Sequence, residues 1–265
     1  MKVITFGTDN KGYYPLLLDS CKKNDITLNN LGFGKPWTGF TMKHELLKNY
    51  LESADENEII LCIDAYDVVI LQPEKTILQT FLSFNTNILF ADQTSLFTKL
   101  QYYHWKGRVH NAGCFIGYVK YIKQLIDIIC NPEYIELFHK DDQQILNYTM
   151  NQPEHRSFYE KNTKCDKLNQ LFFVTNAIHY FNYGYLTNRE IEIPDGIGVL
   201  HLAGGMNGNT YLESKGFNIS QVKDIDIRFK INQLKDINRV QFTVLCFSII
   251  SPVCMLLFNM IDKIL

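Results

Sequence analysis

Residues 59–67 read Ile-Ile-Leu-Cys-Ile-Asp-Ala-Tyr-Asp, an unbroken apolar run that ends in two acids three positions apart. The run predicts a strand over residues 58–63, and its continuous apolar character is typical of a central strand covered on both faces. Ligands of open α/β sheets bind at the carboxyl ends of the strands, which is where Asp64 and Asp67 stand. The stretch therefore predicts an α/β domain with a binding site at the end of this strand.

Strands and helices alternate along the rest of the chain. Before the central stretch we expect strands over residues 3–8 and 26–31 and helices over residues 13–24 and 43–52. After it, the same patterns predict helices over residues 73–84, 121–131 and 140–150 and strands over residues 87–91 and 111–118. This alternation favours an α/β domain with a largely parallel, Rossmann-like sheet.

The composition narrows the class of protein. Of the 265 residues, 46% are hydrophobic and 20% are charged, which is the balance of a globular protein with a packed core. The formal net charge is −2, so we expect no nucleic-acid partner. The 7 cysteines are scattered and form no CxxC pair, so we expect neither a disulfide framework nor a zinc site.

The two ends of the chain differ in character. Residues 240–261 contain no charged residue, and this run exceeds the ~20 residues that a helix needs to cross a bilayer. We therefore expect a globular domain over residues 1–225, a charged linker over 226–239 and a transmembrane helix over 240–261. The alternative is a hydrophobic helix that packs on the domain or on a partner. The first residues contain no apolar segment of signal-peptide length, so we expect no signal peptide and an anchored domain in the cytosol.

Asp64 and Asp67 can share one cation only if the chain turns at Asp64, because residues three apart in a strand point to opposite faces. A turn would let both carboxylates face a hard cation such as Mg²⁺ or Mn²⁺, which prefers oxygen ligands. The alternative is an acid pair that caps the next turn. A phosphatase of the haloacid type needs its second acid where Tyr66 stands, so the spacing of the acids speaks against that class of enzyme. No GxGxxG follows the first strand, so the phosphate-binding loop of a dinucleotide-binding enzyme is absent.

A second cluster lies at residues 198–205, which read GVLHLAGG. Here an apolar strand delivers His201, and imidazole is the commonest nitrogen ligand of metals. Glycines such as Gly204 let backbone amides approach a phosphate. The alternative is a structural histidine at the end of a strand.

A third cluster lies at residues 139–144, which read HKDDQQ. Asp141 or Asp142 could act as a base on an acceptor hydroxyl or steady a developing oxocarbenium ion. The helix dipole alone also explains acids in a first helical turn, so a purely structural role is the alternative.

Taken in order, these segments resemble the glycosyltransferase domain of procollagen lysyl hydroxylases and related procollagen glycosyltransferases. The resemblance runs from residue 3 to about residue 218. It rests on VITFGT at 3–8, LGFGKPW at 31–37, Lys43, DAYDV at 64–68, HNAGCFIG at 110–117, DDQ at 141–143 and His201.

The resemblance implies a GT-A-type nucleotide-sugar-binding domain that uses Mn²⁺ and a UDP-sugar, UDP-glucose or UDP-galactose. The acceptor it implies is a protein or glycan hydroxyl, such as hydroxylysine or galactosyl-hydroxylysine of a collagen-like protein. The metal ligands it implies are Asp64, Asp67 and His201. The residues it places near the donor are Thr8, Trp37, Lys43, Tyr66 and Asn111. The residues it implicates in catalysis are Asp141 and Asp142.

The chain departs from the family's pattern after the histidine. The family's lysine six residues later is Asn207 here, and its asparagine two residues later is Ala203. A missing cation opposite the diphosphate should weaken donor binding by ~1–3 kcal/mol. Two alternatives therefore stay open: a GT-A transferase with a different glycan acceptor, and a catalytically degenerate, membrane-tethered protein that binds sugars or UDP.

Overall fold

A computed structural model of the chain describes residues 1–94, 98, 108–139, 141–175, 192–203 and 208–222. The chain divides into two units, Met1–Asp224 and Ile225–Leu265. The expected linker, the expected transmembrane helix over residues 240–261 and Gly204 all lie outside the described residues. Among the helices that are described, none has the length and apolar character to span a bilayer.

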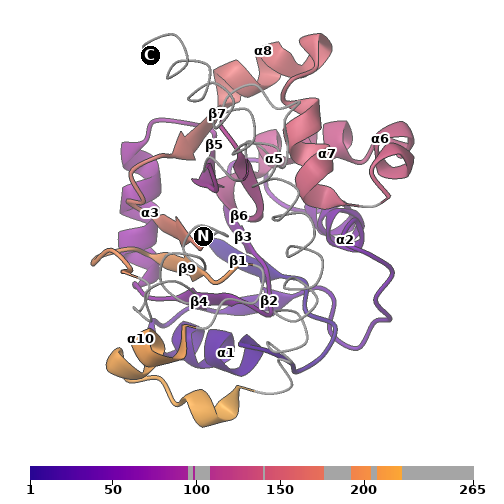
Figure 1. The fold of residues 1–265 in the computed structure, drawn as a ribbon. Coiled ribbons are helices and arrows are strands. Elements are labelled where there is room, and N and C mark those ends of the chain that lie inside the picture. Colours follow the sequence, from indigo (N-terminus) through magenta and orange to yellow (C-terminus); the bar gives the residue numbers. More distant parts are fainter. Residues whose placement is uncertain (95–97, 99–107, 140, 176–191, 204–207, 223–265) are drawn as a thin grey trace, which may run out of the picture. The chain divides into compact units, whose positions relative to one another are not determined.

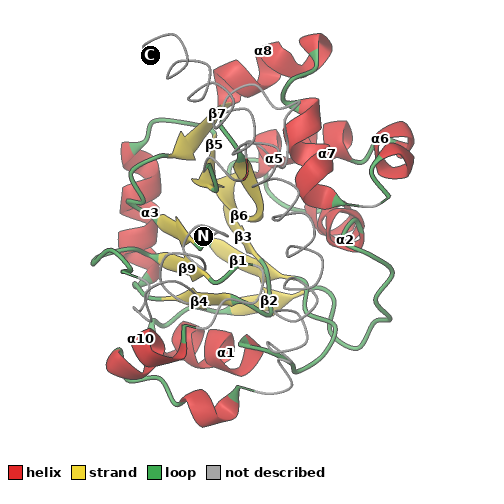
Figure 2. Cartoon of the chain, in the orientation of Figure 1, coloured by secondary structure: helices red, strands yellow, loops and turns green. Residues whose placement is uncertain are grey.

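The first unit is built on a six-stranded sheet with the strand order β2-β1-β3-β6-β5-β7 (Figures 1 and 2). Its strands are β1 (Lys2–Thr5), β2 (Leu28–Asn30), β3 (Ile59–Ile63), β5 (Ile88–Asp92), β6 (His110–Tyr118) and β7 (Thr163–Asp166). Strands β2, β1 and β3 are parallel, as are β5 and β7, but β6 is antiparallel to both of its neighbours. The sheet is therefore mixed, and the expectation of a largely parallel sheet is wrong. An antiparallel neighbour needs no crossover helix, so β6 can follow and pair with β5 directly.

A second, three-stranded sheet has the order β4-β9-β8. Its strands are β4 (Val68–Ile70), β8 (Phe172–Val174) and β9 (Val199–His201), and β9 is antiparallel to β4 and parallel to β8. All of their residues are buried. This sheet brings the end of β9 beside the segment that follows β3.

Helices pack on both faces of the large sheet (Figure 2). The helices are α1 (Tyr14–Lys23), α2 (Met42–Leu51), α3 (Glu74–Ser83), α5 (Val119–Ile129), α6 (Pro132–Leu137), α7 (Asp142–Thr149), α8 (Pro153–Asn162) and α10 (Asn209–Ser214), with a 3-10 turn η2 (Ile219–Gln221). One core joins the sheet to α1, α3 and the small sheet, and the other joins it to α2, α5 and α7.

Strand β3 shows why this arrangement is stable. Leu61 and Ile63 point into the first core, whereas Ile60 and Cys62 point into the second, and all four are essentially inaccessible to solvent. Full burial of one such aliphatic side chain contributes about 1.5–3 kcal/mol. The two-sided burial expected from the apolar run is therefore present, and it fixes the place where the chain leaves the sheet at Asp64.

Candidate metal and active site

Three potential metal ligands converge where β3, β4 and β9 end or begin. Asp64 follows β3, Asp67 precedes β4, and His201 is the last residue of β9. One ligand atom from each lies within 4.8 Å of the other two. The His201 Nε2 atom is 3.3 Å from Asp67 Oδ1 and 3.8 Å from Asp64 Oδ2. The chain therefore turns after β3 in the way that a shared cation requires.

Backbone hydrogen bonds hold the three residues in place. The amide of Asp64 donates to the carbonyl of Gly113 on β6 at 2.8 Å. The carbonyl of Asp67 accepts from the amide of Leu202 at 2.7 Å, next to the β4–β9 pairing of Val68 with His201. Each ligand is thus attached to a regular strand, which gives a more precise geometry than a free loop would.

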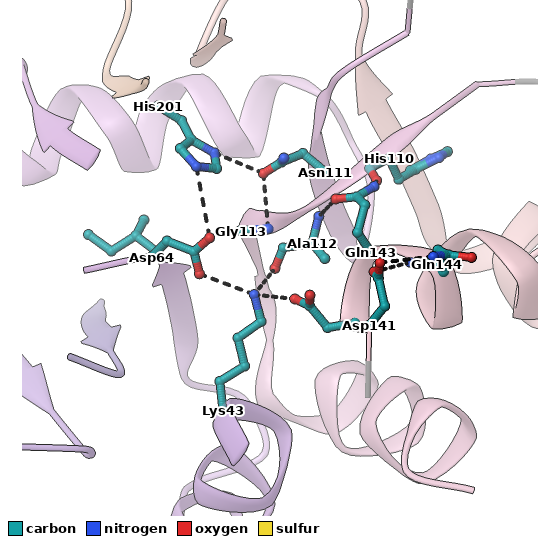
Figure 3. A network of polar contacts seen from close by, with 12 residues as sticks. Lys43, Asp64, His110, Asn111, Ala112, Gly113, Asp141, Gln143, Gln144 and His201 are labelled. Atoms are coloured by element: carbon teal, nitrogen blue, oxygen red, sulfur yellow. Dashed lines mark hydrogen bonds and ion pairs between the residues drawn. The ribbon is translucent and has the colours of Figure 1, made fainter. Parts of the chain in front are cut away.

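Asn111 orients the imidazole of His201 (Figure 3). The Asn111 Oδ1 atom lies 3.0 Å from His201 Nδ1 and also accepts from the amide of Gly113, while its Nδ2 donates to Gln93. With Oδ1 as the acceptor, His201 Nδ1 donates to Asn111, and Nε2 faces the two carboxylates. An outer partner that fixes the tautomer in this way is typical of metal-ligating histidines.

The charge balance of the group fits a cation. Burial lowers the pKa of His201, but the carboxylate of Asp67 and the thiol of Cys114 outweigh burial and hold this pKa well above its usual value. The group therefore attracts positive charge. Two carboxylate oxygens and one imidazole nitrogen form a donor set that suits Mg²⁺ or Mn²⁺ and leaves coordination positions for a substrate phosphate. The residues present fit a divalent metal.

Lys43 lies beside this group but is engaged by the protein (Figure 3). It extends from α2, is 7% exposed, and donates to Asp64 Oδ1 at 3.1 Å and to the carbonyl of Ala112 at 3.2 Å. It also pairs closely with Asp142 Oδ2. Burial alone would lower the pKa of Lys43, but Asp142 and Asp64 raise it, so the ammonium stays charged. Its three N–H groups are thereby accounted for. The role at the diphosphate that the resemblance implies stays a prediction.

The two acids at the start of α7 have different surroundings. Asp141 is the N-cap of the helix, and its carboxylate accepts from the amide and the side chain of Gln144, both at 2.9 Å. Asp142 is buried and reaches the metal group through Lys43. Asp141 therefore has a structural role as the cap of α7, whereas the charge of Asp142 is linked to the metal group through Lys43.

Two of the residues that the resemblance places near a nucleoside, Thr8 and Tyr66, contact each other beyond the ends of β1 and β3. The hydroxyl of Tyr66 accepts from the amides of Thr8 at 2.7 Å and Asp9 at 3.1 Å and bonds the Thr8 hydroxyl at 2.9 Å. Trp37 is 50% exposed and packs edge-to-face on Phe40 with ring centroids 5.5 Å apart. Thr8 and Tyr66 are thus brought together, and Trp37 presents an open ring.

Two residues of the network are absent from the sequence-based set of site residues. Gln93 supports Asn111, and the side chain of Gln143 accepts from the amide of Ala112. Gln143 directly follows the acid pair Asp141 and Asp142, and this position in the motif indicates a residue of the site. No feature of the sequence near Gln93 indicates that it belongs to the site.

We predict that Gly113→Ala disables the metal group. A methyl group on Gly113 would lie 2.6 Å from His201 Cε1 and closer still to Asp64 Oδ2, so the two ligands would have to separate. We expect affinity for Mn²⁺ to fall by more than about tenfold, as for other losses of ligand positioning. Isothermal titration with Mn²⁺ measures the effect, and an unchanged affinity in a folded variant would contradict it.

Comparisons with known proteins identify the family to which the chain is related. The sequence profile of the family described as "PLOD GT domain" matches residues 1–181. The multifunctional procollagen lysine hydroxylase and glycosyltransferase of Caenorhabditis elegans is 27% identical over 194 residues, which are 66% of this chain and 26% of that protein. Procollagen-lysine,2-oxoglutarate 5-dioxygenase 2 of Mus musculus is 30% identical over 160 residues, 54% of this chain and 21% of that protein. The matched region thus spans about a quarter or less of these curated relatives.

A solved structure shares the fold. The galactosyltransferase LgtC, crystallised in complex with donor and acceptor sugar analogues, superposes with a TM-score of 0.51 at 14% identity, covering 82% of this chain and 95% of that one. The first unit therefore has the mixed α/β fold of GT-A glycosyltransferases.

Proposed function

Because the chain belongs to the PLOD glycosyltransferase-domain family, we propose that it transfers a hexose from a UDP-sugar to an acceptor hydroxyl. The observation that carries the proposal is the convergence of Asp64, Asp67 and His201 at the end of the central strand. The proposed cofactor is Mn²⁺. The proposed acceptor is a hydroxylysine or galactosyl-hydroxylysine of a collagen-like protein, and UDP-glucose and UDP-galactose are the donors to test first.

The roles of the side chains follow from their positions. A bound Mn²⁺ would supply Lewis-acid stabilisation of the departing UDP. Thr8 and Tyr66 would border the nucleoside, with the open ring of Trp37 available for stacking. Lys43 keeps Asp64 ionised and ready to bind a cation: burial raises the pKa of Asp64, but Lys43 and His201 lower it below its usual value. Asp142, held by the same ammonium, is the acid we propose to act near the anomeric carbon.

The C-terminal segment is part of the proposal. Residues 240–261 carry no charge, and we propose that they anchor the domain to a membrane from the cytosolic side. Partition of the full chain into the membrane fraction after an alkaline wash would support this, and complete release would contradict it.

We expect release of UDP by the full chain to depend on Mn²⁺ and to favour one sugar among a panel of UDP-sugars. The metal is expected to be required because the diphosphate is a poor leaving group without a cation opposite it. A coupled UDP assay with and without EDTA measures the effect. Binding of UDP without release from any donor would favour the degenerate, sugar-binding alternative, which the change at Ala203 suggests.

A further inference from the structure

A groove outside the metal site runs along β7. It has a volume of about 680 Å³ and is lined by side chains from α8, β7 and the residues at the start of β6. This volume is in the range of functional ligand sites. None of Asp64, Asp67 and His201 is among its lining residues, so it is separate from the metal group.

The groove carries an excess of positive charge. Arg108, Arg156, Lys164 and Lys167 line it, against the single carboxylate of Glu160. Arg108 is neutralised by Asp92, at 2.6 Å. No carboxylate in the described part of the chain pairs with any of the other three cations, and Lys164 donates only to a carbonyl, that of Phe84. The groove therefore presents uncompensated cations that an anionic ligand would neutralise.

An edge strand forms one wall of the groove. Thr163, Lys164 and Cys165 of β7 all line it, and β7 is the last strand of the sheet, bonded to β5 on one side. In the strands that the structure describes, none pairs with its other side. Unpaired backbone groups at a sheet edge recognise an extended polypeptide by strand addition, which a glycan or a free phosphate cannot reproduce.

One end of the groove lies next to the metal site. His110 lines the groove, and the following residue, Asn111, holds His201 (Figure 3). The His110 carbonyl accepts from the side chains of Gln143 and Asn147, so hydrogen bonds to residues of α7 connect the groove with the metal site. Burial lowers the pKa of His110 to about 4, so its imidazole is neutral near pH 7 and adds no charge of its own. A chain lying in the groove would therefore lead towards the reacting groups.

We propose that this groove binds an acidic, extended segment of a polypeptide acceptor, with β7 pairing to its backbone and Arg156, Lys164 and Lys167 binding its carboxylates. The inference rests on the proposed glycosyl transfer and adds to it a docking site for a polypeptide acceptor and the acidic, extended character of the segment that binds there. The acidic segment of the acceptor polypeptide would then lie in the groove, while another part of the same polypeptide presents the acceptor hydroxyl at the metal site.

The test is fluorescence anisotropy of the full chain with a labelled peptide of alternating Glu and Thr. The comparison peptide has Gln in place of every Glu. The variant Arg156→Gln/Lys164→Gln/Lys167→Gln removes the three cations that no carboxylate among the described residues neutralises; all three side chains are exposed, so the fold should be retained. Lys161→Gln is the matched control, because Lys161 is exposed on the same helix, α8, but does not line the groove.

We expect the triple variant to bind the acidic peptide at least about tenfold more weakly than the wild type, with Lys161→Gln unchanged, as for the loss of several charge pairs at an interface. Methylation of the backbone amides that face β7 should weaken binding as well. Equal binding of the Glu and Gln peptides, or an unaffected triple variant, would overturn the proposal. Binding of hyaluronan in place of the peptide would overturn it too, because the ligand would then be an acidic glycan.

Release of UDP in the absence of acceptor, measured on the same samples, separates this inference from the proposed function. The triple variant should release UDP at the wild-type rate, because its substitutions lie outside the metal site. Loss of peptide binding by the triple variant with unchanged UDP release would support the assignment of the groove as the peptide-binding site. If the wild-type chain binds the peptide but turns over no UDP-sugar, the proposed glycosyl transfer is wrong. The groove would then be a peptide-binding site, and its assignment as an acceptor site would be overturned.

Discussion

Replacement of Asp67 by asparagine is expected to abolish metal-stimulated release of UDP while the fold is retained. The asparagine side chain has nearly the same shape but removes one of the two negative charges that face His201 Nε2. Loss of an outer partner of a metal ligand already costs about 10–100-fold in affinity, so loss of a direct ligand should cost at least a hundredfold. Titration with Mn²⁺ and the UDP assay measure the two consequences separately.

The control for this variant is Asp127→Asn. Asp127 is an exposed acid on α5 that pairs with Lys48 and is not part of the metal group. It should bind Mn²⁺ and release UDP as the wild type does. An Asp67→Asn protein with near-wild-type activity would show that the metal site has been assigned wrongly.

Replacement of Lys43 by methionine is expected to lower the free energy of unfolding by about 3–5 kcal/mol, the usual cost of removing one partner from a buried charge pair. Methionine fills much of the space but leaves Asp64 and Asp142 close together without the ammonium that neutralises them. Urea denaturation monitored by circular dichroism measures the effect.

Lys48→Met provides the matched comparison, because Lys48 is on the same helix and pairs with Asp127 at the surface. An exposed pair of this kind contributes about 0–1 kcal/mol. Equal effects of the two substitutions would mean that Lys43 is not the central charge of the site. Excess Mn²⁺ should restore part of the stability lost by Lys43→Met, because a cation at Asp64 replaces some of the missing charge.

Much of the fold could be predicted because its strongest signals are local. The apolar run of β3 predicts both its burial and its central place, and the acids that follow mark the point at which the chain leaves the sheet. The direction of β6 could not be predicted, since an apolar run reads the same for parallel and antiparallel pairing. Strand β4 cannot be predicted from the sequence, because three residues are too few to show a periodicity.

The sequence predicts most of the residues that belong to the site, but it does not predict which of them form ion pairs and hydrogen bonds with one another. The sequence indicates that Asp64, Asp67 and His201 are candidate ligands, and the resemblance places Lys43 at a diphosphate. That Lys43 joins Asp64 to Asp142 depends on how α2 and α7 pack against β6, which local sequence does not encode. The capping role of Asp141 follows from where α7 begins, and helix ends are the least certain feature of a sequence-based prediction.

The attachment of His201 to β4 makes metal occupancy a property of the folded chain as a whole. Two ligands come from one end of the central strand, but the third becomes adjacent only when β9 has paired with β4. An unfolded chain therefore offers a cation no comparable site, and the binding energy is added to the native state alone. A hundredfold excess of free cation over its dissociation constant corresponds to about 2.7 kcal/mol. The cell's supply of the ion would in this way set how long the domain survives as well as how fast it works.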